Sequence, residues 1–224
     1  MKLSWCGHSS FKLTLNSEVL FIDPVRSNKL LNTYLDQTEK ADVVLVTHNH
    51  WDHCDADAIA QLSKETTRFL VPEETMDVLV NGFTFYVHSM ADLKKLLQQV
   101  EIVEPGIQKK LKNNTITVFS ASEGVSFLIT GEVKILFMGD STVTEAMLET
   151  RAHYVVCPYW ALKEKKEQAK IATFPDTTKI IVCHHHTINY GLPHFYLDEK
   201  SFEILFKKGL NIIRLDEQKE ITLH

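Results

Sequence analysis

Short apolar runs alternate with longer amphipathic segments along this chain. The first runs, Lys2–Trp5, Phe11–Leu15 and Val19–Ile22, carry the alternating and β-branched apolar positions that are typical of β-strands. Asp42–Val46 is a continuous apolar run, which is the pattern of a strand buried on both faces. It leads into Thr47–Asp55, a stretch dense in polar residues. The N-terminal part is therefore expected to be strand-rich, with a polar loop after a buried strand.

The same pattern continues to the end of the chain. Further strands are expected at Phe69–Val71, Thr84–Val87, Glu101–Val103, Thr115–Phe119, Val125–Ile129, Lys134–Phe137, Tyr154–Cys157, Lys179–Cys183, Asn211–Leu215 and Glu220–Leu223. Helices are expected at Glu73–Val80, Met90–Gln99, Thr144–Glu149, Ala161–Ala172 and Lys200–Lys207, with a further helix capped by Asp55 or Asp57 and ending near Ser63. No Pro-, Gly- or Ser-rich linker divides the chain. We therefore predict one α/β domain over residues 1–224, with two sheets and helices in layers.

Composition narrows the class of protein. The 224 residues are 44% hydrophobic, which excludes a disordered chain, and a net charge of -5 disfavours a dedicated nucleic-acid binder. The four cysteines are far apart and form no CxxC pair, and no apolar run is long enough to span a bilayer. The N-terminus lacks the apolar run of a signal peptide, so we predict a cytoplasmic protein. Eleven histidines beside four cysteines indicate that any bound metal has imidazole and carboxylate ligands.

The strongest chemical signal is the segment Thr47–His53, which reads T-H-N-H-W-D-H. In an extended segment alternate side chains share a face, so His48 and His50 can converge on one metal ion. Asp52 and His53 fall where the chain turns toward a helix and can face a second ion. Imidazole and carboxylate ligands without thiolate suit Zn²⁺, and also Fe²⁺ or Mn²⁺. The segment predicts a site for one or two metal ions.

These residues resemble the metallo-β-lactamase superfamily, whose hallmark is H-x-H-x-D-H after a strand. The resemblance extends to Trp5–Ser10 and Phe21–Pro24, which look like the opening of the branch that contains L-ascorbate-6-phosphate lactonase. It also covers Phe137–Ser141, which looks like the strand-end G-D-[ST] of the family, and the histidine triplet His184–His186 after a strand. The resemblance implies an αββα four-layer sandwich, with two mixed β-sheets flanked by helices and the site at one edge of the sheets.

The resemblance also implies a ligand set. His48 and His50 would bind the first metal, Asp52 and His53 the second, and Asp140 would bridge them. One histidine of the triplet would complete the second site. Placing Cys183 on the proline of the family's P-x-H selects His185, with His184 as the second choice.

One departure from the family concerns the first metal. The family supplies a third histidine after the strand equivalent to Thr115–Phe119, whereas this chain reads Ser120-Ala121-Ser122-Glu123-Gly124. Glu123 can serve as a carboxylate ligand, Ser122 can leave a water in that position, or the segment can be a surface turn without metal contact. His88 is a further substitute, although a packed or capping role fits a lone histidine better. The number of metal ions therefore stays open.

Three residues outside the ligand set are also candidates. His8, in the Gly7–Ser10 turn, is expected either to contact a substrate anion or to be a structural turn residue. Asp23 can accept a hydrogen bond from a metal-binding histidine and fix its tautomer, or can simply form the Asp-Pro turn. His194, in the segment after the histidine triplet, is a candidate substrate contact.

The function predicted from these features is metal-dependent hydrolysis. A metal-activated hydroxide would attack a small ester, lactone or phosphoester, with Asp52 as the catalytic residue that orients the water and receives its proton. One alternative is a phosphodiesterase or nuclease, which the absence of a visible basic groove disfavours. The other is a metal-binding relative without catalytic activity, which the missing histidine suggests. A small-molecule substrate is expected as partner, with neither nucleic acid nor membrane, and the resemblance to oligomeric lactonases implies a homo-oligomer.

Overall fold

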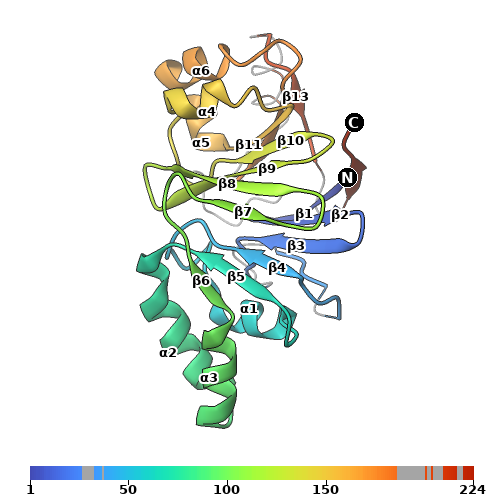
Figure 1. Cartoon of the computed structure of the whole chain (residues 1–224). Helices are drawn as coiled ribbons and strands as arrows, with labels where there is room; N and C mark the ends of the chain where they lie inside the picture. Colours follow the sequence, from blue (N-terminus) through green and yellow to red (C-terminus); the bar gives the residue numbers. More distant parts are fainter. Residues whose placement is uncertain (27–32, 37, 186–199, 201–202, 204–208, 216–218) are drawn as a thin grey trace. The chain divides into compact units, whose positions relative to one another are not determined.

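Two mixed β-sheets form the framework of the protein. A computed structural model (Figure 1) describes residues 1–26, 33–36, 38–185, 200, 203, 209–215 and 219–224. Within these residues the strands are arranged in two sheets of seven. Each sheet belongs to its own compact unit, one comprising Met1–Val103 with Glu217–Leu223 and the other Glu104–Asp216 with His224.

The first unit contains a sheet of order β14-β1-β2-β3-β4-β5-β6. Its strands are β1 (Lys2–Gly7), β2 (Ser10–Leu15), β3 (Glu18–Ile22), β4 (Val43–Leu45), β5 (Arg68–Val71), β6 (Val100–Ile102) and β14 (Glu220–Thr222). The strands from β14 to β3 pair antiparallel, and those from β3 to β6 pair parallel. Its helices are α1 (Ala56–Leu62), the 3₁₀ turn η1 (Glu73–Thr75), α2 (Met76–Tyr86) and α3 (Met90–Gln98).

An apolar cluster joins the helices of the first unit to its sheet. Phe21, Val44 and Phe69 from the strands pack with Ile59 of α1 and Phe83 of α2, and all five side chains are buried. The rings of Phe69 and Phe83 lie 6.0 Å apart. Burial of side chains of this size stabilises the unit by roughly 1.5–3 kcal/mol each. The cluster fixes the helices on the sheet and so fixes the position of the loop that precedes α1.

The second unit repeats this arrangement of strand directions. Its sheet has the order β13-β12-β11-β10-β9-β8-β7, antiparallel from β7 to β10 and parallel from β10 to β13. The strands are β7 (Gln108–Lys110), β8 (Thr115–Ser120), β9 (Val125–Thr130), β10 (Lys134–Phe137), β11 (Tyr154–Pro158), β12 (Lys179–Cys183) and β13 (Ile212–Ile213). Its helices are α4 (Glu145–Glu149), α5 (Tyr159–Lys163) and α6 (Lys165–Ile171), which pack on the sheet through a second apolar cluster.

The expected α/β class with two mixed sheets and helices is confirmed. The prediction of a single domain over residues 1–224 stays a prediction. Within the described part of the chain, no helix has the combined length and apolar character needed to cross a bilayer. The expected helix Lys200–Lys207 lies almost entirely outside the described residues.

Two expected elements were wrong. Thr84–Val87 was expected to be a strand, but α2 continues through Tyr86, and the Thr84 hydroxyl donates to the Val80 carbonyl 2.7 Å away, as in a helix. Ala161–Ala172 was expected to be one helix but forms α5 and α6, because Glu164 between them has extended backbone angles.

In each unit, the candidate residues follow the carboxyl ends of parallel strands, at one end of that unit's own sheet. In the first unit Asp23 follows β3 and Thr47–His53 follows β4, and these two strands run parallel. In the second unit Asp140 comes shortly after β10 and His184 directly after β12, which run parallel with β11 between them. Polar side chains beyond the carboxyl ends of parallel strands are the usual position of a ligand site in α/β proteins.

Candidate metal centre

The T-H-N-H-W-D-H segment folds into a compact turn after β4. The backbone N–H groups of His53 and Cys54 both donate to the His50 carbonyl, at 3.0 and 2.8 Å. This turn gathers three imidazoles, since the His48 ring lies 4.6 Å from the His50 ring and 4.0 Å from the His53 ring. His48 and His53 are each 1% exposed, whereas His50 is exposed. The segment therefore presents clustered imidazoles at the end of a buried strand.

Asp23 organises this cluster through Thr47. The Thr47 backbone N–H donates to Asp23 Oδ1 at 2.7 Å, and the Thr47 hydroxyl donates to Asp23 Oδ2 at 2.8 Å. His53 Nδ1 lies 2.8 Å from the same Oδ2. A carboxylate can only accept hydrogen bonds, so His53 carries its proton on Nδ1. In a neutral imidazole Nε2 then bears the lone pair that can bind a metal.

His48 is held in the same tautomer as His53 by the Thr47 hydroxyl. Thr47 Oγ1 lies 3.0 Å from His48 Nδ1. Because Thr47 uses its single hydroxyl proton in the bond to Asp23, its oxygen accepts the hydrogen bond that His48 donates from Nδ1–H. The two buried histidines, His48 and His53, thus carry the proton on Nδ1 and have the lone pair on Nε2. This is the tautomer that binds a metal through Nε2. His48 and His50 also offer ligand atoms within 4.8 Å of each other. These residues fit a metal that prefers imidazole ligands.

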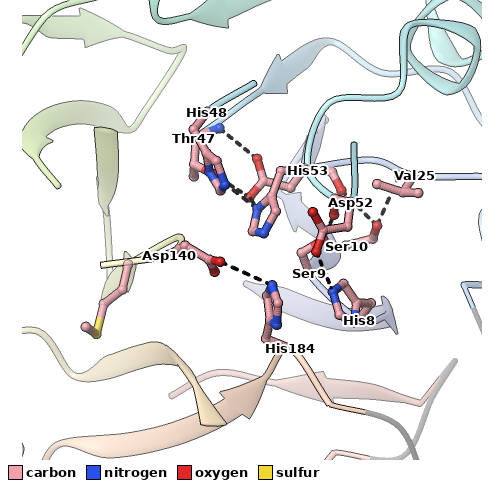
Figure 2. Close-up of polar contacts among 12 residues, drawn as sticks. His8, Ser9, Ser10, Val25, Thr47, His48, Asp52, His53, Asp140 and His184 are labelled. Carbon is pink, nitrogen blue, oxygen red and sulfur yellow. Dashed lines mark hydrogen bonds and ion pairs between the residues drawn. The ribbon is translucent and has the colours of Figure 1, made fainter. Parts of the chain in front are cut away.

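His8 contacts the carboxylate of the same motif. His8 Nε2 lies 2.9 Å from Asp52 Oδ2, and Figure 2 shows the two side chains pointing toward each other. The Ser9 hydroxyl donates to the Asp52 backbone carbonyl. His8 is 0% exposed and Asp52 is 7% exposed. The β1–β2 turn and the motif, which are far apart in sequence, are therefore in contact in the first unit.

The second unit contributes a smaller group of candidate ligands. His184 Nε2 lies 3.4 Å from Asp140 Oδ2, and Figure 2 shows this pair. His185 is also buried, at 1% exposure. Glu123 and Asp140 offer ligand atoms within 4.8 Å of each other, although Glu123 is exposed. Within this unit Asp140 therefore lies close to His184 on the one hand and to Glu123 on the other.

The segment that lacks the expected histidine is tied to the loop after Asp140. The Ser122 backbone N–H donates to Ser141 Oγ at 3.0 Å, and the Thr142 backbone N–H donates to Ser122 Oγ at 3.1 Å. These paired bonds hold the turn between β8 and β9 beside Asp140 and place Glu123 near it. His88 lies on the exposed connection between α2 and α3 in the first unit.

Some candidates lie outside the described residues, and some functional residues were not anticipated. His186 and His194 belong to the part of the chain that the structure does not describe. Thr47 and Ser9 were not singled out from the sequence, although both hydrogen-bond to members of the candidate site. The available signal for Thr47 was its position directly before the histidine motif, where a hydroxyl can reach the imidazole that follows it.

Cys54 adjoins the motif but has the chemistry of a core residue. Burial, with smaller contributions from the charges of Asp23 and Asp55, raises the pKa of the Cys54 thiol to about 12. The thiol is 3% exposed and packs in the apolar cluster of the first unit. The donor set of the candidate centre therefore consists of imidazole and carboxylate groups.

The role of Asp23 gives a first testable prediction. Asp23→Asn is expected to weaken metal binding roughly 10- to 100-fold, the usual effect of losing an outer hydrogen-bond partner of a ligand. An amide NH₂ in place of Oδ2 opposes the His53 Nδ1–H and favours the tautomer with the proton on Nε2. Titration of the metal-free protein with Co²⁺, followed by its visible absorption, measures the change.

Asp42→Asn is the matched control for this variant. Asp42 also accepts a backbone N–H, from Val19 at 2.8 Å, and it precedes the same strand β4. It lies at the opposite end of that strand from the motif. Equal Co²⁺ affinity in Asp23→Asn and Asp42→Asn would contradict the role assigned to Asp23.

Comparison with known proteins places the chain among related sequences and folds. Residues 2–154 match the family model described as beta-lactamase superfamily domain. A UPF0173 metal-dependent hydrolase of Thermodesulfovibrio yellowstonii is 31% identical over 141 residues, covering 61% of this chain and 43% of the relative. One from Flavobacterium johnsoniae is 27% identical over 236 residues, covering 100% of both chains. The fold resembles that of isothiocyanate hydrolase from Delia radicum gut bacteria, with a TM-score of 0.73, 14% identity and coverage of 100% of this chain and 99% of that chain.

The match to several curated relatives is partial. It covers 43%, 65% and 32% of the length of three of them, all below two thirds. The relative from Flavobacterium johnsoniae extends the similarity to the whole chain, at lower identity.

Proposed function

Because the chain belongs to the beta-lactamase superfamily, we propose that it is a metal-dependent hydrolase that acts on a small ester, lactone or phosphoester. The observation that carries this proposal is the Asp23–Thr47 network, which engages Nδ1 of two buried histidines and leaves each in the tautomer of a metal ligand. The names of the UPF0173 relatives support the same activity.

The proposed ligands are those of the histidine motif and of the second unit. His48 and His50 would bind one metal, Asp52 and His53 the other, and Asp140 would bridge them. For the remaining position the candidates are His185 and, as the second choice, His184. The 3.4 Å distance between His184 Nε2 and Asp140 Oδ2 supports His184. Glu123, whose carboxylate lies near that of Asp140, is proposed to take the place of the missing third histidine.

The proposed cofactor is Zn²⁺, as one or two ions, with Mn²⁺ or Fe²⁺ as alternatives. Imidazole and carboxylate donors suit these metals. When bound, such an ion lowers the pKa of water and polarises the bond to be cleaved. Asp52 would orient the attacking water and accept its proton. Asp23 and Thr47 would keep His48 and His53 in the ligand tautomer throughout.

Net charge and the family resemblance bear on the substrate, the partners and the location of the protein. We propose a small-molecule substrate, without nucleic acid or membrane as partner, because the net charge is -5. A cytoplasmic location and a homo-oligomer are proposed on the grounds given by the sequence. The lactonase branch stays a prediction, and phosphodiester hydrolysis is the alternative substrate class.

A panel of chromogenic substrates tests the proposal. We expect the protein to hydrolyse at least one of p-nitrophenyl acetate, a γ-lactone and bis(p-nitrophenyl) phosphate. Stripping with a chelator should abolish the activity, and Zn²⁺, Mn²⁺ or Fe²⁺ should restore it, because a bound metal would activate the attacking water. The substrate that turns over identifies the substrate class.

Two outcomes would contradict the proposal. Activity that survives complete metal removal would contradict metal dependence. A protein that binds metal but hydrolyses none of the three substrates with any of the three metals would favour a metal-binding relative without catalysis. His88→Ala, on the exposed connection between α2 and α3, serves as a control that should leave both binding and turnover unchanged.

A further inference from the structure

The turn between β1 and β2 has an unusual backbone conformation. Gly7 pairs with Ser10, so only His8 and Ser9 connect the two strands. His8 has a φ of 50°, in the left-handed region that residues other than glycine seldom adopt. Such a conformation costs free energy and persists only where the surroundings enforce it. The contacts of His8 therefore indicate which residue this turn holds in position.

Three hydrogen bonds enforce the conformation of this turn. The buried indole of Trp5 donates from Nε1 to the His8 carbonyl at 2.9 Å. The Ser9 hydroxyl donates to the Asp52 carbonyl, and His8 Nε2 lies 2.9 Å from Asp52 Oδ2. Trp5 thus fixes the turn from one side. The other two bonds attach it to the backbone and to the side chain of the same residue, Asp52.

The chemistry of the His8–Asp52 pair determines which atom donates. The Asp52 carboxylate accepts hydrogen bonds only, so the proton lies on His8 Nε2. A hydrogen bond to a charged acceptor is shorter and stronger than one between neutral groups, which restrains rotation of the carboxylate. His8 is 0% exposed, so it is better placed to orient Asp52 than to bind an anion from solution.

We propose that His8 is a positioning residue that holds Oδ2 of Asp52, so that Oδ1 is the oxygen presented to the metal and to the attacking water. This inference rests on the proposed function, because it gives Asp52 its role there. Ser9 supports the same end by fixing the backbone of Asp52. The turn between β1 and β2 thus restrains both the side chain and the backbone of Asp52.

Two variants of similar length separate the hydrogen bond from the volume of the side chain. His8→Gln keeps an N–H donor near the position of Nε2, whereas His8→Met fills similar space without a donor. Both substituted residues must adopt the φ of 50° found at position 8, so the backbone strain is the same in the two variants. We expect Co²⁺ to bind His8→Met roughly 10- to 100-fold more weakly than wild type, with shifted visible absorption bands. His8→Gln should restore both the affinity and the spectrum, and His88→Gln should match wild type.

A second measurement needs neither metal nor a folded His8→Met variant. Long-range ¹H–¹⁵N correlation spectra of the metal-free wild-type protein report which ring nitrogen of His8 carries the proton. We expect a fixed Nε2–H tautomer, which Asp52→Ala should release. A proton on Nδ1, or a tautomer unchanged by Asp52→Ala, would overturn the inference.

The outcomes distinguish this inference from the proposed function. Wild-type affinity and spectrum in His8→Met, with Co²⁺ still bound, would overturn the positioning role and leave the proposed function standing. Equal losses in His8→Gln and His8→Met would overturn it as well, because they would show a role of side-chain shape alone. A wild-type protein that binds no Co²⁺ would overturn the proposed function, and this inference with it.

Discussion

Asp52→Asn is expected to reduce turnover by roughly 10²- to 10⁴-fold, the range for loss of a positioned proton acceptor. The amide has the size of the carboxylate, and its oxygen can still accept a hydrogen bond from His8 Nε2. The bond from Ser9 to the residue 52 carbonyl involves the backbone and is unaffected. The amide cannot, however, take up the proton of the attacking water. The fold should therefore be retained while the reaction is lost.

Steady-state rates on the best substrate of the panel measure this loss, and urea unfolding checks the fold. Asp57→Asn is the matched control, because Asp57 lies five residues away and pairs with Arg26 at 2.6 Å, outside the proposed ligand set. It should retain turnover within a factor of about two, since surface ion pairs of this kind contribute little. Turnover of Asp52→Asn close to that of Asp57→Asn would refute the assignment of Asp52.

His48→Ala is expected to remove metal binding almost completely. Losing a ligand should cost more than the roughly 10- to 100-fold that follows loss of an outer hydrogen-bond partner. The loss should also appear in stability. A metal present at about 100 times its Kd stabilises the folded state by about 2.7 kcal/mol, and the variant should lose this increment.

Thermal unfolding with and without added Zn²⁺ makes this comparison, and elemental analysis gives the metal content. Wild type should melt at a higher temperature with Zn²⁺ than without it, and His48→Ala should show no difference. His153→Ala controls for general loss of a histidine, because His153 is exposed and contacts the Lys134 backbone in the second unit. An undiminished response to Zn²⁺ in His48→Ala would exclude His48 as a ligand.

The elements that bear the candidate site could be predicted because their signals are local. Strand β12 (Lys179–Cys183) has the predicted bounds, since a run of β-branched residues is followed by polar ones. Asp55, one of the two predicted caps, accepts from the backbone N–H groups of Asp57 and Ala58 at the start of α1. A short side chain that caps a helix acts on its immediate neighbours, so the sequence pattern is enough to indicate it.

Elements that depend on distant contacts could not be predicted. The alternation around Phe83 and Phe85 resembles a strand, yet α2 continues because Phe83 packs on Phe69 while Phe85 is 89% exposed. The contact between His8 and Asp52 joins residues 44 apart, and the left-handed turn that allows it has no sequence signature without a glycine at position 8. Tertiary packing decides both features, and a local pattern does not contain it.

The pairing of β1 with β14 has a consequence for synthesis on the ribosome. Lys2 and Glu220, which form an ion pair across these two strands, lie 218 residues apart. Within the described sheet, β1 lacks its neighbour β14 until that strand has been translated. Open strand edges can pair with other chains, so the missing neighbour of β1 is an aggregation liability during this interval. The edge is closed only when β14, near the end of the described chain, pairs with β1.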